Sequence, residues 1–241
     1  MPASIPAVTY AILGVTVIVY VLQLVSLVVF GAPAPGLDWL ELYGARVNDL
    51  IRAGQIWRFF TPALLHGSIP HIAFNMYALY SFGGSLERHF GHARFLCLYI
   101  LAAFSGNVLS FFFGSDAGFS VGASTAIFGL VAAEGIFLFQ NRALFGRQFG
   151  RAIGNIIFVV AINLFLGGLA QGIDNWGHIG GLLGGLIFAW FAGPVLQVEG
   201  VYPALSLKDS RELREIVTGA GAVVLIFGAL AVWGIVAPIG R

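Results

Sequence analysis

The sequence predicts an all-α protein, a polytopic membrane bundle of seven helices, and two observations lead to this prediction. Of the 241 residues, 59% are hydrophobic and only 10% are charged, whereas a soluble domain carries about 25% charged residues. The apolar residues gather in seven charge-poor runs, each bounded by glycine, proline or a charged cluster. These runs are Val8–Phe30, Ile69–Leu86, Phe95–Phe113, Val121–Phe139, Ala152–Leu169, Trp176–Phe191 and Ile216–Ile239.

The first run is long enough, at about 1.5 Å per residue, to span a hydrocarbon core of about 30 Å. No lysine or arginine precedes it, and it exceeds the apolar region of a signal peptide, about 7–15 residues, so we expect a retained helix. The segment Gly31–His66 then opens with a glycine- and proline-rich stop and mixes charged with aromatic residues. That mixture is typical of the membrane–water boundary, so we expect an irregular loop lying half-sunk in the interface.

Composition also limits the function. The net charge of +1 gives no reason to expect a nucleic-acid partner. Cys97 is the only cysteine and lies within a predicted helix, which excludes disulfides, paired-cysteine redox chemistry and cysteine-ligated metal sites. No segment is polar enough and long enough to form a separate soluble domain.

The distribution of basic residues predicts the orientation, because seven helices place their connecting loops alternately on two sides of the membrane. One side receives Arg88, Arg94, Arg142, Arg147, Arg151, Lys208, Arg211 and Arg214. The other side receives Arg46, Arg52, Arg58 and Arg241. By the positive-inside rule, the first side and the N-terminus are cytoplasmic. We therefore expect an integral protein of the cell (plasma or inner) membrane.

Two residues at the starts of apolar runs suggest chemistry. Ser124 stands between small residues, and His178 is set among glycines. An ionisable group inside a membrane is costly and is a functional candidate, and a serine facing a histidine suggests a nucleophile with its general base. In the first helical turn, Ser124 would also have free backbone N–H groups beside it for a developing oxyanion. The alternative for Ser124 is a serine that packs against a neighbouring helix.

His178 must come within about 3 Å of Ser124 to accept its proton. Small residues let helices approach closely, and the glycines of the last core run form two adjacent faces, one at 177, 181 and 185 and one at 180 and 184. Both Ser124 and His178 lie near the outer ends of their helices, so the site is expected to open to the extracytoplasmic side. Asp174 lies four residues before His178, and a helix cap explains it more simply than the third member of a triad.

The second run adds His71 and Asn75, which lie on one helical face because they are four residues apart. Both can donate hydrogen bonds to an oxyanion. His66 lies off that face and is interpreted as a structural group between loop and helix. A zinc protease is the rival interpretation, but it needs His-Glu-x-x-His on a helix, and the sequence has none. We therefore expect no metal and no cofactor.

Taken together, these motifs resemble the rhomboid family of intramembrane serine proteases, over about residues 8–191. The matching elements are Trp57-Arg58, the series His66, His71 and Asn75, the segment Gly122 to Thr125, and His178 followed by Gly181 and Gly185. The resemblance implies a rhomboid-like six-helix core with a C-terminal seventh transmembrane helix. It also implies a dyad without an acid, in which Ser124 is the nucleophile and His178 the general base. His71, Asn75 and the Ser124 N–H would form the oxyanion site, and Trp57-Arg58 would be structural.

The sequence departs from the family pattern at two places. Phe128 stands one turn after Ser124 where the family often has tyrosine, so it keeps the stacking on His178 and loses a hydroxyl contact. The family's Glu-x-Arg after the second helix reads Glu87-Arg88-His89 here. We expect residues 1–196 to form the protease core, and residues 197–241 to form a cytoplasmic linker and the extra helix.

The expected function is an intramembrane serine endopeptidase that cleaves transmembrane segments of single-span or polytopic membrane proteins within the lipid bilayer, near their extracytoplasmic end. The loop Gly168–Asn175 is the expected lid. One alternative is a catalytically inactive rhomboid-like protein that binds membrane clients; such a protein is expected to lack the serine or the histidine. A small-solute transporter would predict an internal repeat, which the sequence does not show.

Overall fold

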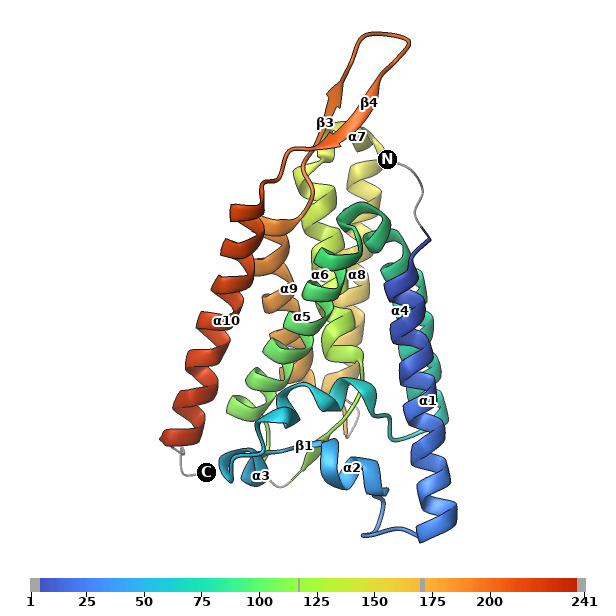
Figure 1. Ribbon diagram of the computed structural model, residues 1–241, viewed down its shortest axis with the longest axis vertical. Coiled ribbons are helices and arrows are strands. Elements are labelled where there is room, and N and C mark those ends of the chain that lie inside the picture. Colours follow the sequence, from blue (N-terminus) through green and yellow to red (C-terminus); the bar gives the residue numbers. More distant parts are fainter. Residues whose placement is uncertain (1–4, 117, 170–171, 238–241) are drawn as a thin grey trace.

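The computed structural model describes residues 5–116, 118–169 and 172–237. Each of the seven predicted runs overlaps a helix of the bundle in Figure 1. These helices are α1 (Ala7–Phe30), α4 (Ile69–Phe90), α5 (His92–Phe113), α6 (Ser124–Gln140), α8 (Gln148–Leu169), α9 (Asn175–Ala192) and α10 (Leu213–Val236). The all-α prediction is confirmed. The last two residues of the seventh predicted run lie outside the described residues.

The helices differ in how well they suit a membrane by length and composition. Among the described residues, α1, α5, α8 and α10 are long and apolar enough to cross a bilayer. The other three predicted spans, α4, α6 and α9, do not meet those limits; α6, for example, has 17 residues. They contact the qualifying helices along the bundle, and together the seven make an integral membrane protein.

The centre of the bundle is the contact of α9 with α5 and α6, and glycines make it possible. On one face of α9, a Cβ atom at Gly181 would collide with the Thr125 carbonyl oxygen, and one at Gly185 with the backbone of Gly129 on α6. On the adjacent face, a Cβ at Gly184 would collide with the Ser105 hydroxyl on α5. The two predicted glycine faces therefore pack against two different helices, with the backbones in direct contact.

Helix α1 packs in the opposite way, through polar residues. Its buried residues are Thr9, Thr16, Gln23 and Ser26, while most of its larger apolar side chains are exposed. Near its start, the Thr9 N–H and hydroxyl donate to the Glu87 carboxylate at 2.7 and 2.6 Å, and the Val8 N–H donates at 2.8 Å. Glu87, the first residue of the Glu-Arg-His sequence that differs from the family's Glu-x-Arg, thus binds the start of α1 to the end of α4.

The segment between α1 and α4 is more regular than predicted. It contains α2 (Trp39–Gly44), β1 (Arg46–Val47), α3 (Asn48–Arg52) and the 3-10 helices η1 (Ile56–Phe59) and η2 (Thr61–Leu64). The prediction of an irregular loop was wrong there, because Asp38 caps α2 by accepting from the Leu40 and Glu41 N–H groups. The buried Arg58 donates to the Leu42 and Ala45 carbonyls, so the Trp57-Arg58 pair lies in the structural framework of this segment.

Two short sheets complete the fold. Strand β1 pairs antiparallel with β2 (Phe119–Ser120) and ties the first loop to the segment before α6. Strands β3 (Leu196–Glu199) and β4 (Ser206–Asp209) form a hairpin that the sequence did not predict. Figure 1 shows this hairpin projecting beyond one end of the helices, near the short helix α7 (Arg142–Phe145), whereas α2 and α3 lie at the other end.

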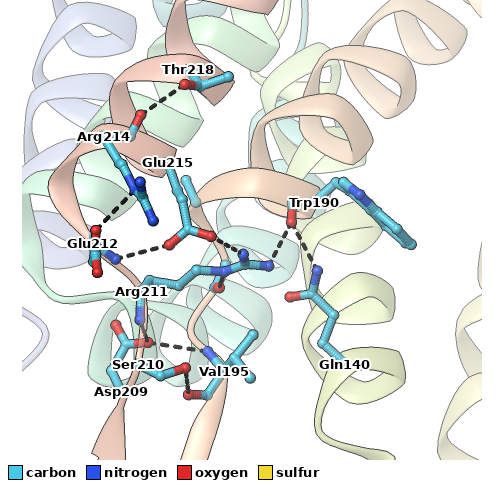
Figure 2. A network of polar contacts seen from close by, with 12 residues as sticks. Gln140, Trp190, Val195, Asp209, Ser210, Arg211, Glu212, Arg214, Glu215 and Thr218 are labelled. Carbon is cyan, nitrogen blue, oxygen red and sulfur yellow. Dashed lines mark hydrogen bonds and ion pairs between the residues drawn. The ribbon is translucent and has the colours of Figure 1, made fainter.

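A polar network at the base of the hairpin joins it to α9 and α10. Figure 2 shows Arg211 at its centre. The Arg211 guanidinium donates to the Trp190 carbonyl at 2.8 Å and to the Glu215 carboxylate at 2.7 Å. Gln140, at the end of α6, donates to the same Trp190 carbonyl, also at 2.8 Å. The network therefore fixes the start of α10 against the ends of α6 and α9.

Candidate active site

Ser124 is the first residue of α6, with Ala123 as its N-cap. The preceding Gly122 has φ +129°, a region that favours glycine, and a Cβ there would lie 2.7 Å from the His71 Nε2 atom. The Gly122 N–H donates to the Pro62 carbonyl at 2.9 Å, which anchors this turn to the first loop. The Ser124 N–H lies in the first turn, where a helix leaves its N–H groups without intrahelical partners.

His178 reaches Ser124 from α9. The Ser124 Oγ atom and the His178 Nε2 atom are 2.9 Å apart, a hydrogen bond between the two predicted partners. His178 is buried, and the Phe128 ring stacks on the imidazole with centroids 4.2 Å apart and planes at 10°. The geometry thus brings Ser124, His178 and Phe128 together, with Phe128 limiting how the imidazole can rotate.

Asp174 caps α9 and does not orient His178. Its carboxylate accepts from the Gly177 N–H at 2.8 Å and from the Ser110 hydroxyl on α5. The His178 Nδ1 atom has no hydrogen-bond partner among the described residues. The cap predicted for Asp174 is therefore confirmed, and the serine–histidine pair stands without an acid within the part of the chain that the structure describes.

His71 and Asn75 lie in the first turns of α4 and line the same cavity as Ser124. The Asn75 side chain donates to the His71 carbonyl at 3.0 Å, which leaves one of its two N–H bonds for another acceptor. The His71 Nε2 atom is packed against Gly122, next to Ser124. Both predicted donors thus line the cavity that contains Ser124.

His66 connects the loop before α4 to the start of α6. Its Nε2 atom accepts from the Ala123 N–H at 3.4 Å, and its ring lies 5.0 Å from that of His71. Burial, with a smaller contribution from the nearby His71, lowers the pKa of His66 to about 3. A neutral His66 can therefore keep its lone pair on Ala123. This contact was not predicted, and no motif spacing would have shown it.

A cavity of about 510 Å³ opens at the serine–histidine pair. It is bounded by α4, α6, α8 and α9 and by the loop before α9. Phe74, Ala78 and Phe82 from α4 and Val159 and Val160 from α8 make much of its apolar wall. Asn163 of α8 also lines it, a residue that the sequence analysis did not single out. Of the predicted lid, 168–175, residues 170 and 171 lie outside the described residues.

The described residues contain no group of three or more histidine, cysteine, aspartate or glutamate side chains arranged to hold a metal ion. The cavity and the side chains at its floor are those of a buried serine–histidine site on a polytopic helical membrane protein.

Comparison with known proteins identifies the group to which this chain belongs. Residues 53–195, more than half of the chain, match the family model described as Rhomboid domain. The chain therefore belongs to the rhomboid family, as the motif resemblance predicted. The family supports intramembrane proteolysis as a general activity, on substrates that are themselves membrane proteins.

Similar curated proteins come from a bacterium and a plant. The chain is 40% identical over 184 residues to Rhomboid protease GluP of Bacillus subtilis (strain 168), covering 76% of this chain and 34% of that protein. It is 36% identical over 158 residues to RHOMBOID-like protein 9, chloroplastic, of Arabidopsis thaliana, covering 65% and 36%. With RHOMBOID-like protein 1 of the same plant it shares 38% over 152 residues, covering 63% and 38%. The chain thus spans about a third of the length of these relatives.

Proposed function

We propose that this protein is an intramembrane serine endopeptidase that cleaves transmembrane segments of other membrane proteins near their extracytoplasmic end, with Ser124 as nucleophile and His178 as general base. The observation that carries the proposal is the 2.9 Å hydrogen bond between Ser124 and His178 at the floor of a cavity bounded by four helices. A serine that merely packs between helices needs neither a histidine partner nor an open cavity.

The chemistry follows from the positions of these groups. His178 in its neutral form accepts the Ser124 proton at Nε2 as the Oγ atom attacks the scissile carbonyl carbon. The resulting oxyanion meets the Ser124 N–H, the free N–H of Asn75 and the His71 imidazole. His178 then gives the proton to the leaving amine, and an acyl-enzyme remains on Ser124. Water attacks the ester while His178 takes its proton, which releases the new carboxyl end and restores the serine.

Substrate access is expected from the α8 side. Helix α8 packs chiefly on α6, and among its described residues Gly167 alone is buried. A scissile bond inside a helix is hydrogen-bonded and shielded, so the substrate must unwind locally. Glycine, proline and small side chains near the cut should therefore be favoured. The orientation proposed from the basic residues makes the site open outward, where water is available.

The orientation can be tested with single cysteines in a Cys97→Ser background. Gly118 is exposed at the end of the bundle that carries the candidate site, and Arg147 is exposed at the hairpin end. Gly118→Cys should react with a membrane-impermeant maleimide in intact cells, and Arg147→Cys only after permeabilisation. The reverse pattern would place cleavage on the cytoplasmic side.

The proposed activity is tested by cleavage of a single-span substrate in proteoliposomes. Ser124→Ala and His178→Ala should each abolish cleavage, and the melting temperature of each variant, compared with that of the wild type, checks that the variant stays folded. Near wild-type turnover in either variant would disprove the dyad. A wild-type protein that binds the substrate and never cuts it would favour the inactive client-binding alternative.

A further inference from the structure

The wall that α8 contributes to the cavity carries a polar group that the mechanism above does not use. Helix α8 contributes Val159, Val160 and Asn163 to the cavity lining. Asn163 is exposed, and its Nδ2 atom donates to the Val159 carbonyl one turn earlier, at 2.8 Å. An amide has two N–H bonds and an accepting oxygen. The Asn163 Oδ1 atom and one N–H therefore remain without a protein partner within the described residues.

A polar side chain in this position is costly unless something binds it. The α8 run is otherwise almost entirely apolar from Ala152 to Leu169, with Asn155 as the second amide. Placing an amide among apolar surroundings without its hydrogen bonds costs free energy, and polar residues within membrane helices mark functional positions. Asn163 projects into the cavity in which the proposed substrate must lie, so the missing partner is expected there.

The substrate has a matching need. When a transmembrane helix unwinds, its N–H and carbonyl groups lose their partners, and within a bilayer each of them must be satisfied by protein or trapped water. His71, Asn75 and the Ser124 N–H are committed to the scissile carbonyl. The neighbouring peptide groups need partners from another wall of the cavity. An amide side chain supplies a donor and an acceptor together, the complement of one peptide group.

We propose that Asn163 is a substrate-binding residue, which accepts a hydrogen bond at Oδ1 from a backbone N–H of the unwound segment beside the scissile bond. This inference rests on the proposed function and extends it to substrate recognition. Such a contact recognises the backbone of the substrate and not its side chains. It selects segments that have unwound, since the N–H groups of an intact helix are already bonded to their own carbonyls.

The first test compares Asn163→Leu with the matched variant Asn155→Leu. Asn155 lies on the same helix, is also exposed and is not part of the cavity lining. With a single-span substrate in proteoliposomes, Asn163→Leu should lower kcat/KM about tenfold, chiefly through KM, because the bond is present in the ground state and the transition state alike. Asn155→Leu should stay within about twofold of wild type.

A fluorophosphonate probe serves as the readout that a merely structural role would change. The probe reacts with an activated serine and has no peptide N–H, so Asn163→Leu should be labelled at Ser124 within about twofold of the wild-type rate. If labelling falls in parallel with cleavage, Asn163 acts on the shape of the site and the proposal is overturned. If the wild type is neither labelled nor able to cleave, the proposed function fails as well, a result distinct from every other.

The second test removes the N–H from the substrate. In a set of synthetic substrates, single peptide bonds flanking the scissile bond are replaced by esters, each of which lacks one N–H. At one position the wild type should lose about tenfold in kcat/KM, while Asn163→Leu should lose nothing further, because the same bond is already absent. The proposal would be overturned if, at every position, the ester lowered kcat/KM by the same factor in Asn163→Leu as in the wild type. It would also be overturned if Asn163→Leu cleaved the unmodified substrate as well as the wild type does.

Discussion

Helices α9 and α8 border the same cavity, and they are held in opposite ways. Half of the 18 residues of α9 are buried, and its glycines touch the backbones of α5 and α6. Of the described residues of α8, Gly167 alone is buried, and a Cβ added at Gly150 or Gly154 would meet nothing within 4 Å. Under the proposed function, the chemistry is carried by a closely packed helix, and substrate entry is expected along the helix with the fewest buried residues.

The same division appears in composition. The candidate site residues come from α4, α6 and α9, the three bundle helices that are less suited to cross a membrane by length and hydropathy. Helix α6 is apolar but has only 17 residues, whereas glycines and polar side chains of α4 and α9 take part in the close helix contacts and in the site.

The strongest test compares two asparagines, one that lines the cavity and one on α8 that does not. Removing an oxyanion donor costs roughly 2.7–4 kcal/mol of transition-state stabilisation, about 10²–10³ in kcat. Asn75→Ala in the cavity lining should therefore lower kcat by at least two orders with little change in KM, and His71→Ala should act in the same direction. Steady-state kinetics on a single-span substrate measures both. Asn155→Ala on α8 is the control and should be near neutral.

A different outcome for Asn75 would change its assignment. The average hydrogen bond between membrane helices is worth about 0.6 kcal/mol. A lowered melting temperature with kcat preserved in the folded fraction would therefore make Asn75 a packing residue and leave only Ser124 and His178 in catalytic roles.

The second test perturbs the packing directly, by replacing one glycine of α9 and one glycine of α8 with alanine. In Gly181→Ala, the new methyl group must displace the Thr125 carbonyl on α6, which moves α9 away from Ser124. A misplacement of about 1 Å can cost 10²-fold in rate, so cleavage should fall by about that factor. Gly154→Ala on α8 has open space and should keep wild-type activity and thermal stability. Equal effects of the two changes, measured by cleavage and melting temperature, would contradict the contrast.

The smallest predicted effect is a pH dependence of stability that arises from two buried groups, His66 and Glu41. Burial lowers the pKa of His66 to about 3, so the unfolded chain binds a proton below about pH 6.5 that the folded protein does not. Stability should therefore fall as the pH is lowered from about 6.5 toward 3. Burial raises the pKa of Glu41 to about 7, so the folded protein holds a proton that the unfolded chain has lost, and stability should fall as the pH rises from about 4.5 to 7.

The two slopes can be separated by substitution. The His66 contribution has the opposite sign between about pH 4.5 and 6.5, so the test is the difference between variant and wild type. Glu41→Gln keeps an acceptor for the capping box and removes the carboxyl proton, so the melting temperature of this variant should increase relative to that of the wild type as the pH rises from 4.5 to 7. A difference that stays constant over this range would show that Glu41 is not the group responsible.

Much of this arrangement could be predicted from the sequence, because a bilayer imposes strong rules. Seven charge-poor runs predicted the seven helices of the bundle, and the spacing of glycines at 177, 181 and 185 predicted the face that meets α6. The small-residue settings of Ser124 and His178 predicted their pairing, and the cap role of Asp174 followed from its place before an apolar run. The division at residues 196 and 197 stays a prediction.

Other features depend on contacts between distant segments and could not be predicted this way. The β3–β4 hairpin has strands of only four residues, and although β3 alternates apolar and polar residues, β4 does not, so its pairing depends on the base held by Arg211 and its partners. Asn163 was not singled out from the sequence, because only the fold places it in the lining of the cavity that contains Ser124. The buried residues Thr9, Thr16 and Gln23 repeat every seven positions on α1, and that spacing was a readable signal of its packing face.

The central claim is that Ser124 is activated by His178, and serine-directed fluorophosphonate labelling of the purified protein in proteoliposomes tests it most directly. Labelling needs no knowledge of the natural substrate. The wild type should be labelled on Ser124, as located by peptide mass analysis, whereas Ser124→Ala and His178→Ala should not be labelled although both stay folded. Labelling of wild type and His178→Ala at the same rate, or at a serine other than 124, would contradict the account.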